Sequence, residues 1–260
     1  MFGKFEHKYS VFRFYKSYKT IYNIKKLEIM LKIGVLGTGA VGDAIGSKLI
    51  ELGHSVMMGS RTAKNEKALA FVAKNNERAS AGTFADAAAF GEMIFNCTSG
   101  IGSLDALKSA GENNLNGKVI VDIANPLDFS KGMPPSLFVT NTNSLGEEIQ
   151  KAFPMTMVVK TLNTMWCGIM VNPAMLNSGD HNVFVSGNDG DAKNQVKEIL
   201  KSFGWLGINI VDLGDIMTAR ATEMYLPLWL SIFGTEKNGV FNIKIIRQGA
   251  NSQETISYII

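Results

Sequence analysis

A glycine-rich turn, GTGAVG at residues 37–42, lies between an apolar run and a stretch with helical spacing. The run before it, Lys32–Leu36 (KIGVL), has the pattern of a buried strand. The stretch after it, residues 40–52, places apolar or small residues at every third or fourth position and ends at Gly53, a suitable helix terminator. A strand, a glycine turn and a helix in this order constrain the fold more than any other feature of the sequence.

The three glycines of this turn have separate physical roles. Gly37 permits a tight turn, Gly39 lets the backbone approach a pyrophosphate, and Gly42 lets the helix pack close to the strand. The start of the helix offers unpaired N–H groups and the positive end of its dipole to phosphates. We therefore expect a dinucleotide at this turn, bound by Gly37, Thr38, Gly39, Ala40, Val41 and Gly42.

The rest of the body alternates short apolar runs with amphipathic stretches. We expect further strands at residues 55–59, 79–83, 93–98, 119–123, 158–162, 183–186 and 208–211, and a last strand at 239–247. We expect further helices at residues 63–75, 85–90, 103–110, 145–153, 192–203 and 217–233. This alternation predicts an α/β fold, a doubly wound and mostly parallel Rossmann sheet with a C-terminal helix.

The residues after the second expected strand indicate which dinucleotide binds. An NAD site usually has Asp or Glu there, hydrogen-bonded to the ribose 2′-hydroxyl. This chain has Gly59-Ser60-Arg61-Thr62, with Lys64 close behind, and no carboxylate that would repel a 2′-phosphate. Arg61 can fork onto phosphate oxygens, and Ser60 and Thr62 can donate hydroxyl protons. We therefore predict NADP(H) as the cofactor, held by Ser60, Arg61, Thr62 and Lys64.

The first 30 residues differ in composition from the rest. They carry seven Lys or Arg and two Asp or Glu, together with eight of the 24 aromatic residues of the 260-residue chain. The remaining 230 residues have a net charge of −2, which argues against a nucleic-acid interface across the body. We expect residues 1–30 to be a basic-aromatic leader outside the folded domain at 31–247, with a tail at 248–260, so that deleting residues 1–29 leaves NADPH binding intact. A lipid-surface anchor and an interaction arm are alternative roles for the leader.

The positions of the cysteines and histidines indicate the cellular compartment and argue against a metal site. Cys97 and Cys167 lie 70 positions apart, and no stretch has the apolar length of an export signal or a membrane span. We expect two free thiols in a cytoplasmic protein without a transmembrane segment. His7, His54 and His181 are too scattered to suggest a metal site, so we expect none.

No residue is a convincing proton donor for the reduction of a carbonyl or imine. His54 precedes the second strand, at the sheet edge opposite the cofactor, and His181 is expected in a polar loop. Lys160 or Asp122 could serve, but a Lys or Asp on a strand is more often part of a structural pair or a cap. We therefore assign no catalytic residue. Hydride exchange between a nicotinamide and a flavin-like ring needs positioning more than proton transfer, which favours that chemistry.

A series of short segments between Lys32 and Arg247 carries a family resemblance. The segments are KIGVLGTGAVG (32–42), GSR (59–61), Cys97-Thr98, VDIANP (121–126), KTLNTM (160–165), VFVSGND (183–189), and DLG (212–214) followed by Ala219-Arg220 and Glu223. In this order they resemble the coenzyme F420-dependent NADP oxidoreductase family, and more loosely the reductase domains of ferric-reducing membrane proteins. The leader and the tail depart from the family pattern.

The resemblance implies further site residues and a partner. It implies that Thr98 and Asn125 join the cofactor site, and that Asn163, Thr164 and Met165 flank the nicotinamide and the deazaflavin on the substrate side. It also implies a homodimer, with the C-terminal helix closing the site and pairing with a second subunit. The apolar stripe on that helix, for which intramolecular core is the alternative, consists of Leu226, Leu228, Trp229, Leu230, Ile232 and Phe233.

Three functions remain open from the sequence. The leading one is hydride transfer between NADPH and coenzyme F420, FMN, FAD or a related flavin-type acceptor. The second is an NADPH-dependent imine or carbonyl reductase similar to pyrroline-5-carboxylate reductase, which would show a pH profile set by an acid. The third is a non-catalytic NADP(H)-binding redox sensor, which would bind NADPH without turnover.

Overall fold

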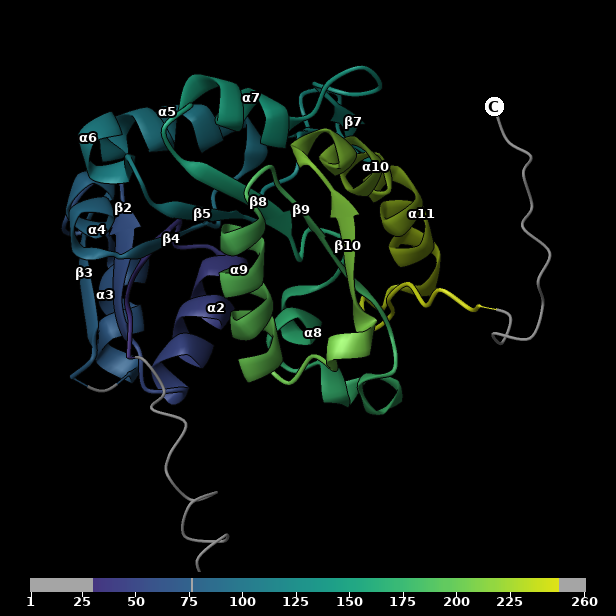
Figure 1. Ribbon diagram of the computed structural model, residues 1–260, viewed down its shortest axis with the longest axis horizontal. Helices are drawn as coiled ribbons and strands as arrows, with labels where there is room; N and C mark the ends of the chain where they lie inside the picture. The colour runs from purple at the N-terminus through teal and green to yellow at the C-terminus, as the bar shows by residue number, and fades with distance from the viewer. Residues whose placement is uncertain (1–29, 76, 248–260) are drawn as a thin grey trace, which may run out of the picture. The chain divides into compact units, whose positions relative to one another are not determined.

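The computed structural model describes residues 30–75 and 77–247 (Figure 1). The leader and the tail expected from the sequence lie outside these ranges, apart from Met30, and their roles stay predictions. No helix within the described ranges is long and apolar enough to cross a membrane. A cytoplasmic location stays a prediction as well.

Eight strands form one sheet, in the order β10-β9-β8-β5-β4-β1-β2-β3. Their bounds are β1 Lys32–Leu36, β2 Ser55–Ser60, β3 Ala79–Thr83, β4 Met93–Asn96, β5 Val119–Asp122, β8 Met157–Thr161, β9 Val183–Ser186 and β10 Ile210–Gly214. All neighbouring strands pair in parallel except β8 and β9, which are antiparallel. The predicted doubly wound, mostly parallel sheet is confirmed. Most of the strand ends lie within about two residues of the predicted ends.

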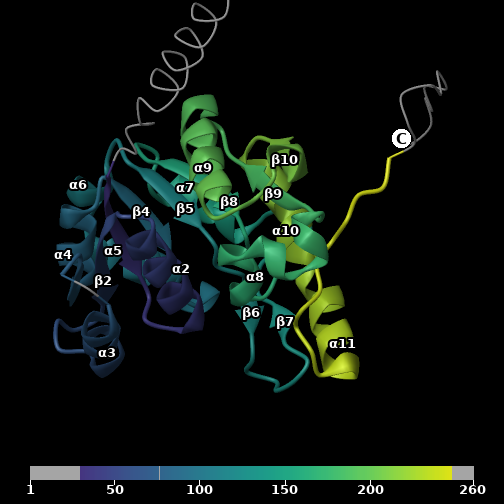
Figure 2. The same ribbon diagram turned by 90° about the horizontal axis from the view of Figure 1, so that it is seen from below.

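Helices cover both faces of the sheet (Figures 1 and 2). One face is covered by α2 Ala40–Glu51, α3 Glu66–Lys74, α8 Cys167–Val171 and α9 Gly190–Ser202, and the other by α4 Phe84–Phe90, α5 Gly100–Ala110, α6 Glu112–Leu115, α7 Leu145–Ala152 and α10 Ala219–Met224. Side chains alternate along a strand, so β1 sends Ile33 and Val35 to the first core and Leu36 to the second. Continuous apolar strands are therefore buried on both faces.

The C-terminal helix predicted at residues 217–233 is divided. A 3-10 turn at Ile216–Thr218 and α10 come first, and α11 Leu226–Glu236 follows. Pro227 at the start of α11 has no N–H to continue the hydrogen bonds of α10, which explains the break. Only Leu226 of the apolar stripe is buried, whereas Leu228 and Phe233 are exposed. Intramolecular core therefore does not explain the whole stripe, and the homodimer stays a prediction.

The prediction of a strand at residues 239–247 is wrong. This segment joins no sheet. It is held instead by Asn182, whose N–H donates to the Ile243 carbonyl at 2.8 Å and whose Oδ1 accepts from the Ile245 N–H at 2.6 Å. Asn242 donates to the Asn182 carbonyl at 2.8 Å. Individual hydrogen bonds, most of them with Asn182, thus replace the regular ladder that the apolar run suggested.

The sequence also missed several short elements. These are a two-stranded antiparallel hairpin, β6 Leu127–Asp128 and β7 Ser136–Leu137, and the short helices α6 and α8. Elements of two to five residues are too short to show a period of 2 or 3.6 residues.

Candidate functional site

A cleft of about 690 Å³ opens at the carboxyl ends of β1, β2 and β4. The strand order reverses here, because the chain proceeds from β1 to β2 on one side and returns to β4 on the other. Ligands of open parallel sheets bind in the crevice at such a switch point. Seven of the predicted site residues line this cleft, namely Gly37, Thr38, Gly39, Ser60, Arg61, Thr62 and Thr98.

The glycine turn leaves the cleft floor open. Gly37 has φ +116°, and a Cβ there would lie 2.6 Å from the carbonyl oxygen of Cys97, so only glycine fits. A Cβ on Gly42 would clash with the carbonyl oxygen of Gly37. A Cβ on Gly39 would meet nothing within 4 Å. Protein packing therefore does not require glycine at 39, and the open space above it fits a closely approaching pyrophosphate.

The first turn of α2 faces this space without a side-chain cap. Its N-cap is Gly39, and no side chain accepts a hydrogen bond from the first N–H groups. These N–H groups and the helix dipole can therefore serve an anionic ligand. The residues present fit the phosphates of a dinucleotide.

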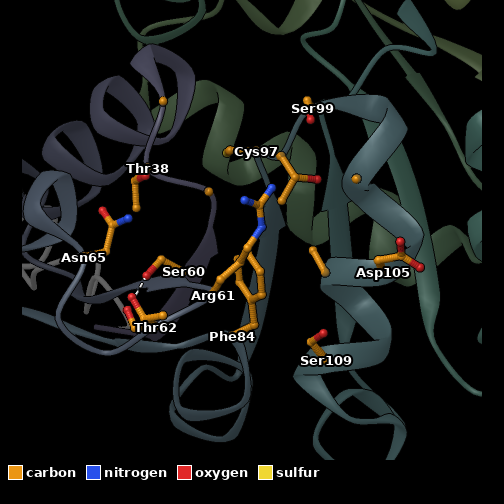
Figure 3. A pocket seen from close by; sticks show the side chains of 15 residues that line it. Thr38, Ser60, Arg61, Thr62, Asn65, Phe84, Cys97, Ser99, Asp105 and Ser109 are labelled. Carbon is orange, nitrogen blue, oxygen red and sulfur yellow. Dashed lines mark hydrogen bonds between the residues drawn. The ribbon is translucent and has the colours of Figure 1, made fainter. Parts of the chain in front are cut away.

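The end of β2 forms the second wall of the cleft. Arg61 is exposed, makes no ion pair within the described residues, and extends into the cleft in Figure 3. Ser60 is buried and its Oγ donates to the Thr62 carbonyl at 2.6 Å, so its proton holds the turn and only its lone pairs remain for a ligand. Lys64 is exposed and does not line the cleft.

Lys160 lies inside a buried ion cluster next to the cleft. Its Nζ is 2.8 Å from Asp122 Oδ2 and 2.7 Å from Glu223 Oε1, and it also donates to the Ala124 carbonyl. Burial alone would lower the pKa of Lys160, but the carboxylates of Asp122 and Glu223 raise the pKa above its ordinary value. The expected structural pair is therefore present, with Glu223 as a third member that the sequence did not reveal.

Glu223 also joins two helices. Its carboxylate accepts from the N–H groups of Leu145 at 2.8 Å and Gly146 at 3.0 Å, at the start of α7. The positive end of the α7 dipole offsets part of the second negative charge in the cluster. α10, α7 and the ends of β5 and β8 are thereby linked through one buried group.

The predicted substrate-side residues do not line the cleft. Asn163, Thr164 and Met165 are all buried. Asn125 and Asn163 bond reciprocally across the ends of β5 and β8, with Asn125 Nδ2 donating to the Asn163 carbonyl at 2.8 Å and Asn163 Nδ2 donating to Asn125 Oδ1 at 2.9 Å. Ala40, Val41 and Gly42 are also outside the lining, in the first turn of α2. The roles of all these residues stay predictions.

The two described histidines make hydrogen bonds away from the cleft, and Cys97 and Cys167 are both free thiols. His54 Nδ1 accepts from the Leu31 N–H at 3.2 Å at the amino end of the sheet, away from the cleft. His181 lies in the loop before β9, as expected, and its ring is buried against Trp205. Burial raises the pKa of the Cys97 thiol, which lies under the glycine turn. Within the described part of the chain, no cluster of His, Cys, Asp and Glu could hold a metal ion.

The far wall of the cleft was missed by the sequence reasoning. It comes largely from α5, which follows β4 at the same sheet edge, and Asn65 before α3 lies on the opposite side of the cleft, near Thr38 and Ser60 (Figure 3). The additional lining residues are Asn65, Phe84, Cys97, Ser99, Gly102, Asp105, Ala106 and Ser109. The lining residues on α5 could have been found from the position of α5 directly after β4, but only once the strand order is known.

Comparisons with known proteins agree with this geometry. Residues 32–126 match the family model described as NADP oxidoreductase, coenzyme F420-dependent. A crystal structure from Arthrobacter sp. FB24, whose assigned function is F420-dependent NADP reductase, is 48% identical, covers 84% of this chain and 100% of that chain, and has a TM-score of 0.79. A reductive aminase from Aspergillus terreus, in complex with NADPH and ethyl levulinate, is 17% identical, covers 79% of this chain and 62% of that chain, and has a TM-score of 0.55, which shows the fold alone.

A curated relative is similar over a shorter share of its own length. Metalloreductase STEAP3 from Rattus norvegicus is 27% identical over 208 residues, which are 76% of this chain and 38% of the relative. The chain thus spans well under half the length of that relative. The 48% identity to the Arthrobacter protein over its full length establishes the family. The chain belongs to the coenzyme F420-dependent NADP oxidoreductase family, a family of NADP-dependent oxidoreductases.

Proposed function

We propose that this chain transfers hydride between NADPH and coenzyme F420 or a related flavin-type acceptor. The observation that carries the proposal is the cleft, which brings the glycine turn after β1 and Arg61 after β2 together at the switch point of the sheet. The acceptor class is supported by the Arthrobacter relative, whose assigned function is F420-dependent NADP reductase.

The residues of the cleft would act by binding and orientation. When bound, NADPH supplies a hydride, and the acceptor takes that hydride together with a proton from solvent. The uncapped start of α2 would hold the pyrophosphate, and Arg61 would hold the 2′-phosphate. Fixing the 2′-phosphate and the pyrophosphate limits where the nicotinamide ring can lie, which is the main protein contribution to a reaction between two rings.

The engaged state of Lys160, His54 and His181 disfavours an imine or carbonyl reductase that would use one of them as its acid. Lys160 is buried and paired with two carboxylates, and its ammonium group donates to three acceptors. His54 lies at the opposite sheet edge, and the Nε2 of His181 lies 2.9 Å from the Pro173 carbonyl oxygen. Hydride exchange between two rings does not need a proton donor from this set.

The test is stopped-flow oxidation of NADPH by the full chain against F420, FMN, FAD and a small cyclic imine. Fast oxidation by F420 or a flavin, with slow oxidation by the imine, is the expected result. Turnover of the imine with a rate that follows a single acid pKa would replace the proposal with the reductase alternative. Tight NADPH binding with no turnover on any acceptor would indicate the redox sensor.

A further inference from the structure

Thr98 follows β4 and lines the cleft on the side of the glycine turn opposite Arg61. The neighbouring strands β4, β1 and β2 are followed by Thr98, the glycine turn and Arg61, respectively. A dinucleotide with its 2′-phosphate at Arg61 and its pyrophosphate at the turn continues toward β4. Its nicotinamide nucleoside half is therefore the part expected nearest Thr98.

The carboxylate of Asp122 fixes the orientation of the Asn96 carboxamide. Asp122 Oδ1 accepts from Asn96 Nδ2 at 2.8 Å and from the Ala124 N–H at 3.3 Å, and Oδ2 accepts from Lys160. A carboxylate surrounded by donors accepts only. The amide nitrogen of Asn96 must therefore face Asp122, and its oxygen must face Thr98.

This orientation determines where the Thr98 proton lies. Thr98 Oγ1 is 2.6 Å from Asn96 Oδ1, and two oxygens this close need a proton between them. Asn96 Oδ1 has no proton, so Thr98 donates to it. Ser103 Oγ lies 2.8 Å from Thr98 Oγ1 and accepts from Asn96 Nδ2 at 3.2 Å. Because the one proton of Thr98 is donated to Asn96, Ser103 is the donor in its bond with Thr98 and occupies one lone pair of Thr98 Oγ1. The second lone pair of Thr98 Oγ1 is available to a ligand in the cleft. The Thr98 hydroxyl can therefore accept a hydrogen bond from a ligand but cannot donate one to it.

We propose that Thr98 accepts a hydrogen bond from a neutral donor, a ribose hydroxyl or the carboxamide N–H, in the nicotinamide nucleoside half of the bound cofactor. The inference rests on the proposed function only in placing NADP(H) in the cleft. Phosphate oxygens, which accept hydrogen bonds at neutral pH, do not suit this position. Thr98 therefore contributes to the direction in which the dinucleotide lies as well as to its affinity.

The test compares Thr98→Val and Thr98→Ser in the full chain, using calorimetric titration with NADPH and with 2′,5′-ADP. Thr98→Val removes the acceptor and is expected to weaken NADPH binding about fivefold, the cost of one uncharged hydrogen bond. It should leave 2′,5′-ADP binding unchanged, because that probe lacks the nicotinamide half. Thr98→Ser keeps the hydroxyl and should bind both probes like the wild type. If Thr98→Val fails to fold, Thr98→Ala is the second variant, because it places no methyl group where the Thr98 hydroxyl meets Asn96.

A further arm separates the two donors. The 3-acetylpyridine analogue of NADP⁺ lacks the carboxamide N–H and keeps the ribose hydroxyls. If Thr98→Val weakens NADP⁺ and the analogue equally, the ribose is the donor, and if it weakens NADP⁺ alone, the carboxamide is. Unchanged NADPH affinity in Thr98→Val, or equal losses for NADPH and 2′,5′-ADP, would overturn the inference. Failure of the wild type to bind NADPH would instead refute the proposed function.

Discussion

Replacing Lys160 with methionine tests the buried ion cluster most directly. Methionine keeps most of the side-chain length but leaves the carboxylates of Asp122 and Glu223 buried without their common partner. The side chains of Lys160 and Asp122 are 0% exposed and that of Glu223 is 2% exposed, so water does not replace the lost ammonium. Removing one partner of a buried ion pair costs about 3–5 kcal/mol of folding stability. We expect a loss of that size in Lys160→Met.

A domain of this size loses about 2–4 °C in Tm for each kcal/mol. Lys160→Met should therefore melt roughly 6–20 °C below the wild type when unfolding is followed by circular dichroism. The control is Lys197→Met, because Lys197 Nζ also lies 2.7 Å from a carboxylate, that of Asp212, but at the surface. Lys193 remains 2.8 Å from the same carboxylate, so the control should lose less than about 1 kcal/mol.

The pH dependence of stability gives a second check. The two carboxylates raise the folded-state pKa of Lys160 above its ordinary value of 10.5. The stabilisation is therefore complete below the pKa of the unfolded chain and is lost as the pH rises through the folded pKa, above pH 10.5. A Tm equal to that of Lys197→Met at neutral pH would refute the reasoning.

Three further predictions concern the cleft and its floor. Arg61→Ala should weaken NADPH binding by about 1.5–3 kcal/mol in a fluorescence titration, because it removes a charge-assisted phosphate contact. NADH binding should barely change, and Lys64→Ala, outside the lining, should have a smaller effect on NADPH. Gly39→Ala should keep the wild-type Tm but bind NADPH more weakly, whereas Gly42→Ala should lower Tm because its Cβ meets the Gly37 carbonyl. Burial raises the pKa of the Cys97 thiol, so iodoacetamide should not label it in the folded protein by mass spectrometry, and equal labelling of folded and unfolded chain would contradict this.

Much of the sheet could be predicted because buried parallel strands are continuous apolar runs between turns. The run at residues 239–247 looks the same, but whether it forms a strand depends on a free sheet edge beside it. Asn182 occupies its backbone groups instead, and no local pattern shows this. The division at Pro227 was visible in the sequence, since proline lacks the N–H that a continuing helix needs.

The wall of the cleft formed by the glycine turn and Arg61 could also be predicted from local sequence. The glycine turn and Arg61 each follow a strand directly, so local sequence places them at the carboxyl edge. Asp105 and Ser109 of α5 reach the same cleft only because β4 lies beside β1, which is a property of the strand order. Glu223 joins Lys160 from 63 positions further along the chain, and only tertiary packing could reveal it.

The buried cluster and the cleft are parts of one arrangement at the strand ends. Asn96, Asp122 and Lys160 lie opposite one another in register on β4, β5 and β8. Each follows an apolar run, so polar groups are confined to the edge where a ligand would bind. Asp122 orients Asn96, and Asn96 Oδ1 accepts the hydrogen bond that the Thr98 hydroxyl donates, so the charge balance set by Lys160 reaches the cleft wall. Lys160→Met should therefore weaken NADPH binding even at temperatures where it stays folded, whereas Lys197→Met should not.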